Sequence, residues 1–252
     1  MNLRTVAVVF AVIALVGLST GARAQELTDL PPRMIACSPE PFATEVDPGL
    51  AEISVTFDRP MSTEQVGFGD LRWAGAYPGV RNAQPQWSAD GTTCTLPAEV
   101  FDDVTYAVSI NATKGRSRFV DTSGVPAVGF AWVFSTGERT PEQFNPRVVS
   151  CDPAPGATDV DFRLREITVT FDRPVAPDDY SWVIFRGCGL YPGARDGGAP
   201  QVSEDRLTAT LPIRLSPGSV YAIGLNDSFY PGYKDLYGRP VLPLGICFRT
   251  AD

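Results

Sequence analysis

The chain has 252 residues, with 21 Lys and Arg against 29 Asp and Glu, and it contains no histidine. An acidic chain without a basic run repels phosphate backbones, and the lack of histidine removes the commonest general base and metal ligand. The 23 Gly and 23 Pro favour turns and short strands over long helices. We therefore expect no nucleic-acid partner, and a binding or structural module rather than an enzyme.

The first 24 residues predict a signal peptide. Arg4 precedes a thirteen-residue apolar run from Val6 to Leu18, and small residues at 22 and 24 suit a cleavage site. Cleavage before Gln25 would leave 19 basic against 29 acidic residues, a net charge of −10. No later segment is long and apolar enough to span a bilayer. We expect a periplasmic, extracellular or cell-surface protein with no membrane insertion after signal cleavage.

An internal repeat sets the domain organisation. The pentapeptide TFDRP at residues 56–60 recurs at residues 170–174, an offset of 114 residues (170 − 56), and in the middle of each copy the offset becomes 115. We predict a signal peptide at 1–24, an N-terminal lead at 25–33, a first domain at 34–137, a polar linker at 138–146 and a second domain at 147–252.

Within each copy, apolar residues alternate with period two. Ile53, Val55 and Phe57 fall on one face of a strand and polar residues fall on the other. This alternation predicts strands with one buried face. Several short strands in a unit of about 105 residues predict a two-layer β-sandwich. The same alternation continues at residues 106–110, 130–134, 221–225 and 244–248.

Five weak motifs follow one another in the same order in both copies. They are a Phe-Asp-Arg-Pro turn (57–60, 171–174), a Thr-x-x-Leu-Pro strand (93–97, 208–212), a Tyr-centred strand (106, 221), an Asp-x-x-Gly turn (121–124, 235–238) and a closing Phe-x-Thr (134–136, 248–250).

This order resembles the bacterial Ig-like domain of S-layer and other surface proteins. The resemblance implies an all-β fold of two tandem immunoglobulin-like antiparallel β-sandwiches after the signal peptide. It also implies a non-catalytic structural or adhesive module of the cell envelope, and it supplies no catalytic residues. The partner would be an envelope polysaccharide or a surface protein.

Three Tyr-Pro-Gly tripeptides are candidate binding loops. They begin at Tyr77, Tyr191 and Tyr230, and the first two lie at equivalent positions of the repeat. Pro-Gly suits the centre of a type II turn, which explains those two residues without a ligand. The tyrosines, together with Trp73 and Trp87, could instead present aromatic faces to a sugar. A carbohydrate-binding module that uses these five residues is therefore the alternative function.

The five cysteines leave two structural alternatives open. In an oxidising compartment, Cys37 and Cys94 of the first domain could form a disulfide. Cys94 also alternates with Leu96 on the face expected to be buried, so a free thiol in the core is the competing interpretation. A nucleophilic cysteine is not expected, because no histidine is present to activate it.

Acidic residues suggest two further sites. The pairs at 102–103 and 178–179 invite a hydrolase interpretation, a remote third function, but adjacent carboxylates point apart and we predict solvated turn acids. We expect no cofactor, with calcium at the loop residues Asp121, Asp227 and Asp235 as the alternative. Asn111 and Asn226 each begin an Asn-x-Ser/Thr sequence after a strand, where we predict that Asn turns the chain.

Overall fold

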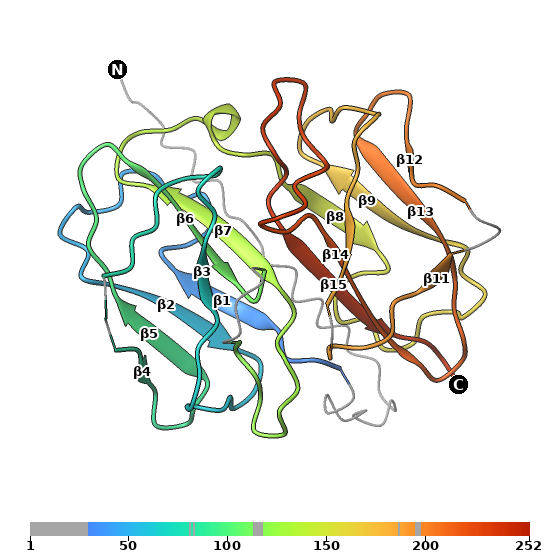
Figure 1. The fold of residues 1–252 in the computed structure, drawn as a ribbon, viewed down its shortest axis with the longest axis horizontal. Coiled ribbons are helices and arrows are strands. Elements are labelled where there is room, and N and C mark those ends of the chain that lie inside the picture. The colour runs from blue at the N-terminus through green and yellow to red at the C-terminus, as the bar shows by residue number, and fades with distance from the viewer. Residues whose placement is uncertain (1–29, 81, 83, 113–117, 186, 195–197) are drawn as a thin grey trace, which may run out of the picture.

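The computed structural model describes residues 30–252 apart from 81, 83, 113–117, 186 and 195–197, so the predicted signal peptide at 1–24 lies outside the described residues. Figure 1 shows two β-sandwiches side by side, which confirms the all-β class and the two immunoglobulin-like sandwiches. Within the described ranges, no helix is long and apolar enough to cross a membrane.

The first sandwich contains seven strands among the described residues. A sheet in the order β1-β2-β5-β4 packs against β3, β6 and β7. The strands are β1 (Met34–Ser38), β2 (Glu52–Phe57), β3 (Phe68–Asp70), β4 (Gln86–Trp87), β5 (Thr93–Pro97), β6 (Thr105–Ile110) and β7 (Phe130–Ser135).

The second sandwich repeats this arrangement after a short 3₁₀ turn, η2 (Pro141–Gln143). Its sheet β11-β13-β9-β8 packs against β10, β14 and β15, with β12 also paired to β13. The strands are β8 (Val148–Asp152), β9 (Glu166–Phe171), β10 (Trp182–Ile184), β11 (Gly193–Ala194), β12 (Gln201–Val202), β13 (Thr208–Arg214), β14 (Val220–Leu225) and β15 (Leu244–Arg249).

Burial in β2 follows the alternation that the sequence predicts. Ile53, Val55 and Phe57 are buried in the core, and the residues between them are partly or fully exposed. The same pattern in β9 builds the second core. The prediction of one buried face is therefore confirmed for β2 and β9.

The prediction of one buried face is wrong for β6, β7, β14 and β15. Ala107, Ala131 and Ala222 point away from the sandwich cores, yet all three are buried. The reason is that small side chains on the outer face of these strands are covered by neighbouring loops and by the other sandwich. These four strands are consequently buried on both faces.

The two sandwiches share a six-stranded sheet in the order β10-β14-β15-β7-β6-β3. The sandwiches meet where β15 lies beside β7, and we call this contact the joint. There, Leu244 of β15 pairs antiparallel with Phe130 of β7, and the N–H of Gly245 donates to the carbonyl of Gly129 at 2.7 Å. Phe130 and Leu244 are counterparts in the repeat, since 130 + 114 = 244. Antiparallel pairing of counterparts is the geometry of a twofold axis, so the joint is an internal quasi-twofold interface.

Two small apolar clusters flank this axis. In one, Leu71 and Val133 of the first sandwich pack with Leu242 of the second. In the other, Phe185 and Cys247 of the second sandwich pack with Val128 of the first. The counterparts of Leu71, Val133 and Leu242 are Phe185, Cys247 and Val128 of the second cluster, as the offset of 114 requires.

The segment predicted as a linker is fixed at both ends. The guanidinium of Arg173 donates to the carbonyl oxygens of Pro141, Glu142 and Phe144. The amide of Asn145 donates to the carbonyl of Pro240 at 2.9 Å. At the start of the segment, the guanidinium of Arg139 contacts a carboxylate oxygen of Asp103 in the first sandwich at 2.7 Å, so these bonds and the shared sheet join the sandwiches into one body.

Candidate functional site

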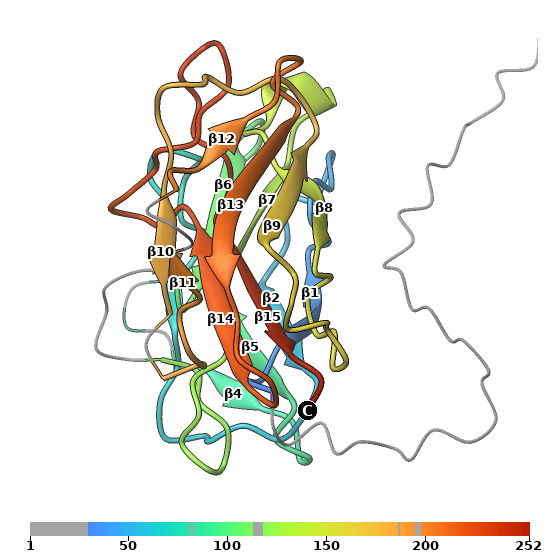
Figure 2. The same cartoon turned by 90° about the vertical axis from the view of Figure 1, so that its right-hand side faces the viewer.

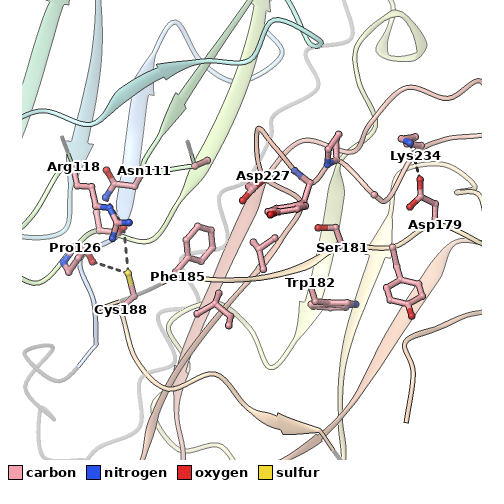
Figure 3. Close-up of a pocket in the computed structure, with 18 residues that line it drawn as sticks. Asn111, Arg118, Pro126, Asp179, Ser181, Trp182, Phe185, Cys188, Asp227 and Lys234 are labelled. Atoms are coloured by element: carbon pink, nitrogen blue, oxygen red, sulfur yellow. Dashed lines mark hydrogen bonds and ion pairs between the residues drawn. The ribbon is translucent and has the colours of Figure 1, made fainter. Parts of the chain in front are cut away.

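A cleft of about 850 Å³ lies between the sandwiches and is the main candidate site (Figure 3). One wall comes from the first sandwich, through Asn111, Arg118 and Pro126. The other wall follows residues 179–185, which include the whole of β10, and the loop at 230–234. Its size falls in the usual range of ligand sites.

Most polar groups in the cleft are engaged within the protein. Lys234 Nζ contacts a carboxylate oxygen of Asp179 at 2.8 Å, at the end of the cleft away from the first sandwich (Figure 3). The indole N–H of Trp182 donates to the hydroxyl of Tyr233 at 2.9 Å. These contacts hold β10 and the adjacent loop in place.

Cys188 lies at the end of the cleft beside the first sandwich. Its Sγ is 3.3 Å from the carbonyl oxygen of Pro126, a contact across the joint. Burial raises the pKa of the Cys188 thiol to about 12, with a further contribution from Cys247 and an opposing one from Arg118. A thiol with so high a pKa is protonated at neutral pH, and Cys188 packs within the joint.

Apolar side chains on the second sandwich remain exposed along the cleft. The exposed fractions are 48% for Tyr180, 57% for Ile184 and 56% for Tyr230. Sequence reasoning singled out only Tyr230 of these three. The signal that could have found the others is the comparison of the two copies, because the counterparts of Tyr180 and Ile184 are Val66 and the charged Asp70.

The joint is asymmetric at one pair of counterparts. Trp73 packs against the cluster that contains Leu71 and Leu242. Its counterpart, at 73 + 114, is Gly187, and a Cβ added there would lie 3.2 Å from Cγ of Pro126 on the cleft wall. An indole therefore packs against the joint on one side, whereas on the other side the backbone of Gly187 lies close to Pro126 and a side chain there would be crowded.

The structure does not bring the five predicted binding residues together. Trp87 is partly buried and stacks on Phe57 with ring centroids 6.5 Å apart, so it belongs to the first core. Trp73 belongs to the joint. Tyr77 and Tyr191 lie in separate sandwiches, with exposed fractions of 36% and 38%.

Intramolecular packing accounts for part of the Tyr77-Pro78-Gly79 motif. A Cβ added at Gly79 would lie 2.3 Å from Cε1 of Tyr77, so the tyrosine ring lies over the glycine. Burial, with a smaller contribution from Asp70, raises the pKa of Tyr77 to about 12. Burial also raises the pKa of Tyr191. The ligand-binding role of these tyrosines stays a prediction.

The Cys37–Cys94 disulfide does not form in the structure. Cys37 of β1 and Cys94 of β5 both pair with Val55, so β2 lies between them. Two strand spacings separate the Cα atoms by roughly 10 Å, beyond the roughly 7 Å limit for a disulfide. Both thiols are free, and Cys94 is buried in the core, which is the competing interpretation.

The candidate calcium ligands serve local turns. A carboxylate oxygen of Asp121 accepts the N–H groups of Ser123 and Val125 at 2.9 Å each, and Asp235 does the same for its own turn. Asp227 accepts the N–H groups of Phe229 and Tyr230. In the part of the chain that the structure describes, no three His, Cys, Asp or Glu side chains form a metal-binding group.

The paired acids are exposed, and Asp102 and Asp103 lie in a turn, as predicted. Asp103 is exposed and contacts Arg139 at 2.7 Å. Asp179 is exposed and contacts Lys234, while Asp102 and Asp178 are also exposed.

Asn111 and Asn226 have equivalent structural roles. Each has a positive φ (50° and 56°) at the end of a strand. The Asn226 amide donates to the carbonyls of Tyr233 and Val241, and the Asn111 amide makes the counterpart bonds. The prediction that asparagine turns the chain here is confirmed.

Comparison with solved structures gives only low similarity. The chain is 13% identical to surface layer protein SbsC, domains 1–6, over 89% of this chain and 42% of that one, with a TM-score of 0.28. It is 12% identical to Dpr2 Ig1–Ig2 in complex with DIP-Theta, over 89% and 97% (TM-score 0.28), and 13% identical to Drosophila N-cadherin EC1–4, over 88% and 50% (TM-score 0.26). The chain thus spans less than half of the SbsC structure.

A search of curated proteins found no match. The family model for the bacterial Ig-like domain matches residues 142–250, which hold the eight strands that the structure describes in the second sandwich. The first sandwich repeats the same order of strands at offsets of 114 and 115 residues. Residues 142–250, the second sandwich, are therefore similar to the bacterial Ig-like domain.

Proposed function

We propose that the protein is a non-catalytic structural or adhesive module of the cell envelope. The rigid joint carries this proposal. The shared sheet, the two flanking clusters and the fixed linker hold the sandwiches in one orientation. Because the two sandwiches keep one orientation, a partner attached to one sandwich keeps a fixed position relative to the other, which suits a structural unit.

Two further observations support a binding role over a catalytic one. The acidic side chains described above act in turns and ion pairs, and burial raises the thiol pKa of Cys188 to about 12. Three exposed apolar side chains, Tyr180, Ile184 and Tyr230, instead line one interdomain cleft. The match to a bacterial Ig-like domain is in keeping with an exported envelope protein.

Fractionation of the producing cells and co-sedimentation of the purified chain with isolated envelope test the proposal. We expect the protein in the envelope or exported fraction and pelleting with envelope material. Recovery in the cytoplasm together with no pelleting would contradict it. A Tyr77→Ala/Tyr191→Ala double variant tests the alternative function, because loss of pelleting on purified polysaccharide would assign carbohydrate binding to those loops.

A further inference from the structure

Strand β10 is an open edge of the six-stranded sheet. Among the residues that the structure describes, it is the terminal strand in the sheet order and pairs only with β14. The N–H of Asn226 donates to the carbonyl of Ser181 at 3.1 Å, so Ser181 and Val183 direct their backbone groups toward β14. Because bonding alternates along an antiparallel strand, the N–H and C=O groups of Trp182 and Ile184 point to the open side.

The other end of the sheet is protected and β10 is not. On β3, the counterpart of Ile184 is Asp70, whose carboxylate forms an ion pair with Arg72 at 2.9 Å. Charged side chains on an edge strand discourage pairing with another chain. Ile184 presents an apolar side chain that is 57% exposed, so β10 lacks this protection.

The interdomain cleft runs along this open edge. Residues 179–185 all line it, a stretch of about 23 Å at the spacing of an extended chain. Arg118 and Pro126 bound one end, and Lys234 lies at the other (Figure 3). Tyr230 also lines the cleft, from the same loop as Lys234. In Figure 2, β10 lies at the opposite margin of the molecule from β8, away from the other sheet. Between these cleft walls, one extended peptide segment fits more readily than the edge strand of a second β-sheet.

We propose that an extended peptide segment of a protein partner binds in this cleft as an added strand on β10. Backbone groups at Trp182 and Ile184 recur every second residue, roughly 6.6 Å apart, which matches the repeat of a peptide strand. The exposed rings of Tyr180 and Tyr230 contact alternate apolar side chains of the peptide. This inference rests on the proposed binding function and names its partner class.

A random heptapeptide library displayed on phage, panned against the immobilised full chain, tests the proposal. We expect enriched peptides with apolar residues at alternate positions. Synthetic copies should bind the chain, and methylation of alternate peptide amides should weaken binding at least tenfold. No enrichment, or binding that is unchanged by amide methylation, would overturn the proposal.

Two proline variants supply a matched pair. Ile184→Pro removes one outward N–H from β10, and edge strands tolerate proline where the N–H faces outward. We expect it to weaken peptide binding at least tenfold, whereas Asp70→Pro, at the counterpart position on β3, leaves binding unchanged. Tyr180→Ala is the second variant if Ile184→Pro does not fold, and it should also weaken binding. Equal binding by the wild type and the folded β10 variants would contradict a strand on β10.

Envelope co-sedimentation distinguishes this proposal from the broader function. If the chain pellets with envelope but selects no peptides, the envelope function stands and the peptide site is wrong. If Tyr180→Ala abolishes binding to purified polysaccharide and Ile184→Pro does not, the cleft binds a glycan and the peptide proposal is overturned.

Discussion

Phe130 and Leu244 pair across the joint between the sandwiches, and they occupy the same position in the two repeats. The two copies of the duplicated domain thus pair with each other through the same edge strand, as the subunits of a twofold dimer do. The usual expectation for tandem domains is relative motion unless the interface is large and apolar. Here the continuous sheet and two apolar clusters predict a single body.

Phe185 tests the apolar contribution to the joint. Its ring lies over Gly129, Gly224 and Gly245, since a Cβ at any of them would come within 3.0 Å of the ring. We expect Phe185→Ala to lower the free energy of unfolding by about 3–5 kcal/mol, measured by urea denaturation. Phe101→Ala is the control, because that ring is 64% exposed. Equal effects of the two substitutions would contradict this role.

Arg173 tests whether the linker is held. Arg173→Ala removes three hydrogen bonds to carbonyl oxygens of residues 141–144. We expect a loss of about 1.5–3 kcal/mol of stability, since the donor is charged, and faster tryptic cleavage at Arg139. Arg72→Ala, at a side chain that is 90% exposed, should change neither. An unchanged cleavage rate in the Arg173 variant would show that the linker does not depend on this contact.

The hydroxyls of Tyr106 and Tyr221 test an element common to both sandwiches. Each accepts an N–H from five residues upstream, from Phe101 at 2.6 Å and from Ser216 at 2.7 Å. This geometry resembles the tyrosine corner of immunoglobulin folds. We expect Tyr106→Phe and Tyr221→Phe each to cost about 1 kcal/mol in urea denaturation. Tyr237→Phe, at an 87% exposed ring, should be neutral, and a similar cost there would argue against the corner bonds.

The buried thiols predict alkaline destabilisation. Burial raises the pKa of Cys37 and Cys94 to about 12 and the pKa of Cys247 to about 11, from the ordinary thiol value of 9.0. Above pH 9 the unfolded chain releases these protons and the folded chain retains them, so stability is full below pH 9 and falls as pH rises toward 12. Urea midpoints between pH 8 and 11 should therefore decrease. Replacing Cys94 with Ala should reduce this slope, and an unchanged slope would contradict the assignment.

The fold could be predicted well from the sequence because the duplication makes each motif occur twice. The offset found in TFDRP relates β1 to β8, β2 to β9 and β7 to β15 residue by residue. Alternation in residues 52–57 also identified the buried face of β2 correctly. Local patterns were sufficient here because, apart from the β7–β15 pair at the joint, the described strands pair within their own sandwich.

The joint and the cleft could not be predicted from alternation alone. Ala107, Ala131 and Ala222 are small enough to fit either a buried or an exposed face, so nothing in β6, β7 or β14 indicated a second packed surface. The cleft combines residues more than 60 positions apart, such as Pro126 and Cys188, and their proximity depends on the joint. Comparing the copies for polar-to-apolar changes, as at Asp70 and Ile184, is the signal that would have pointed to this region.

Amide hydrogen exchange at Gly245 tests the central claim most directly. Its N–H bonds to Gly129 across the joint, whereas the neighbouring N–H of Ile246 points toward β14 within the second sandwich. If the two sandwiches form a single rigid body, the exchange rate of the Gly245 amide should lie within about tenfold of the exchange rate of the Ile246 amide. Both amides would then exchange only when the sheet opens. Exchange of Gly245 at the rate of an unbonded amide, with Ile246 still protected, would show two independently moving sandwiches and contradict the account.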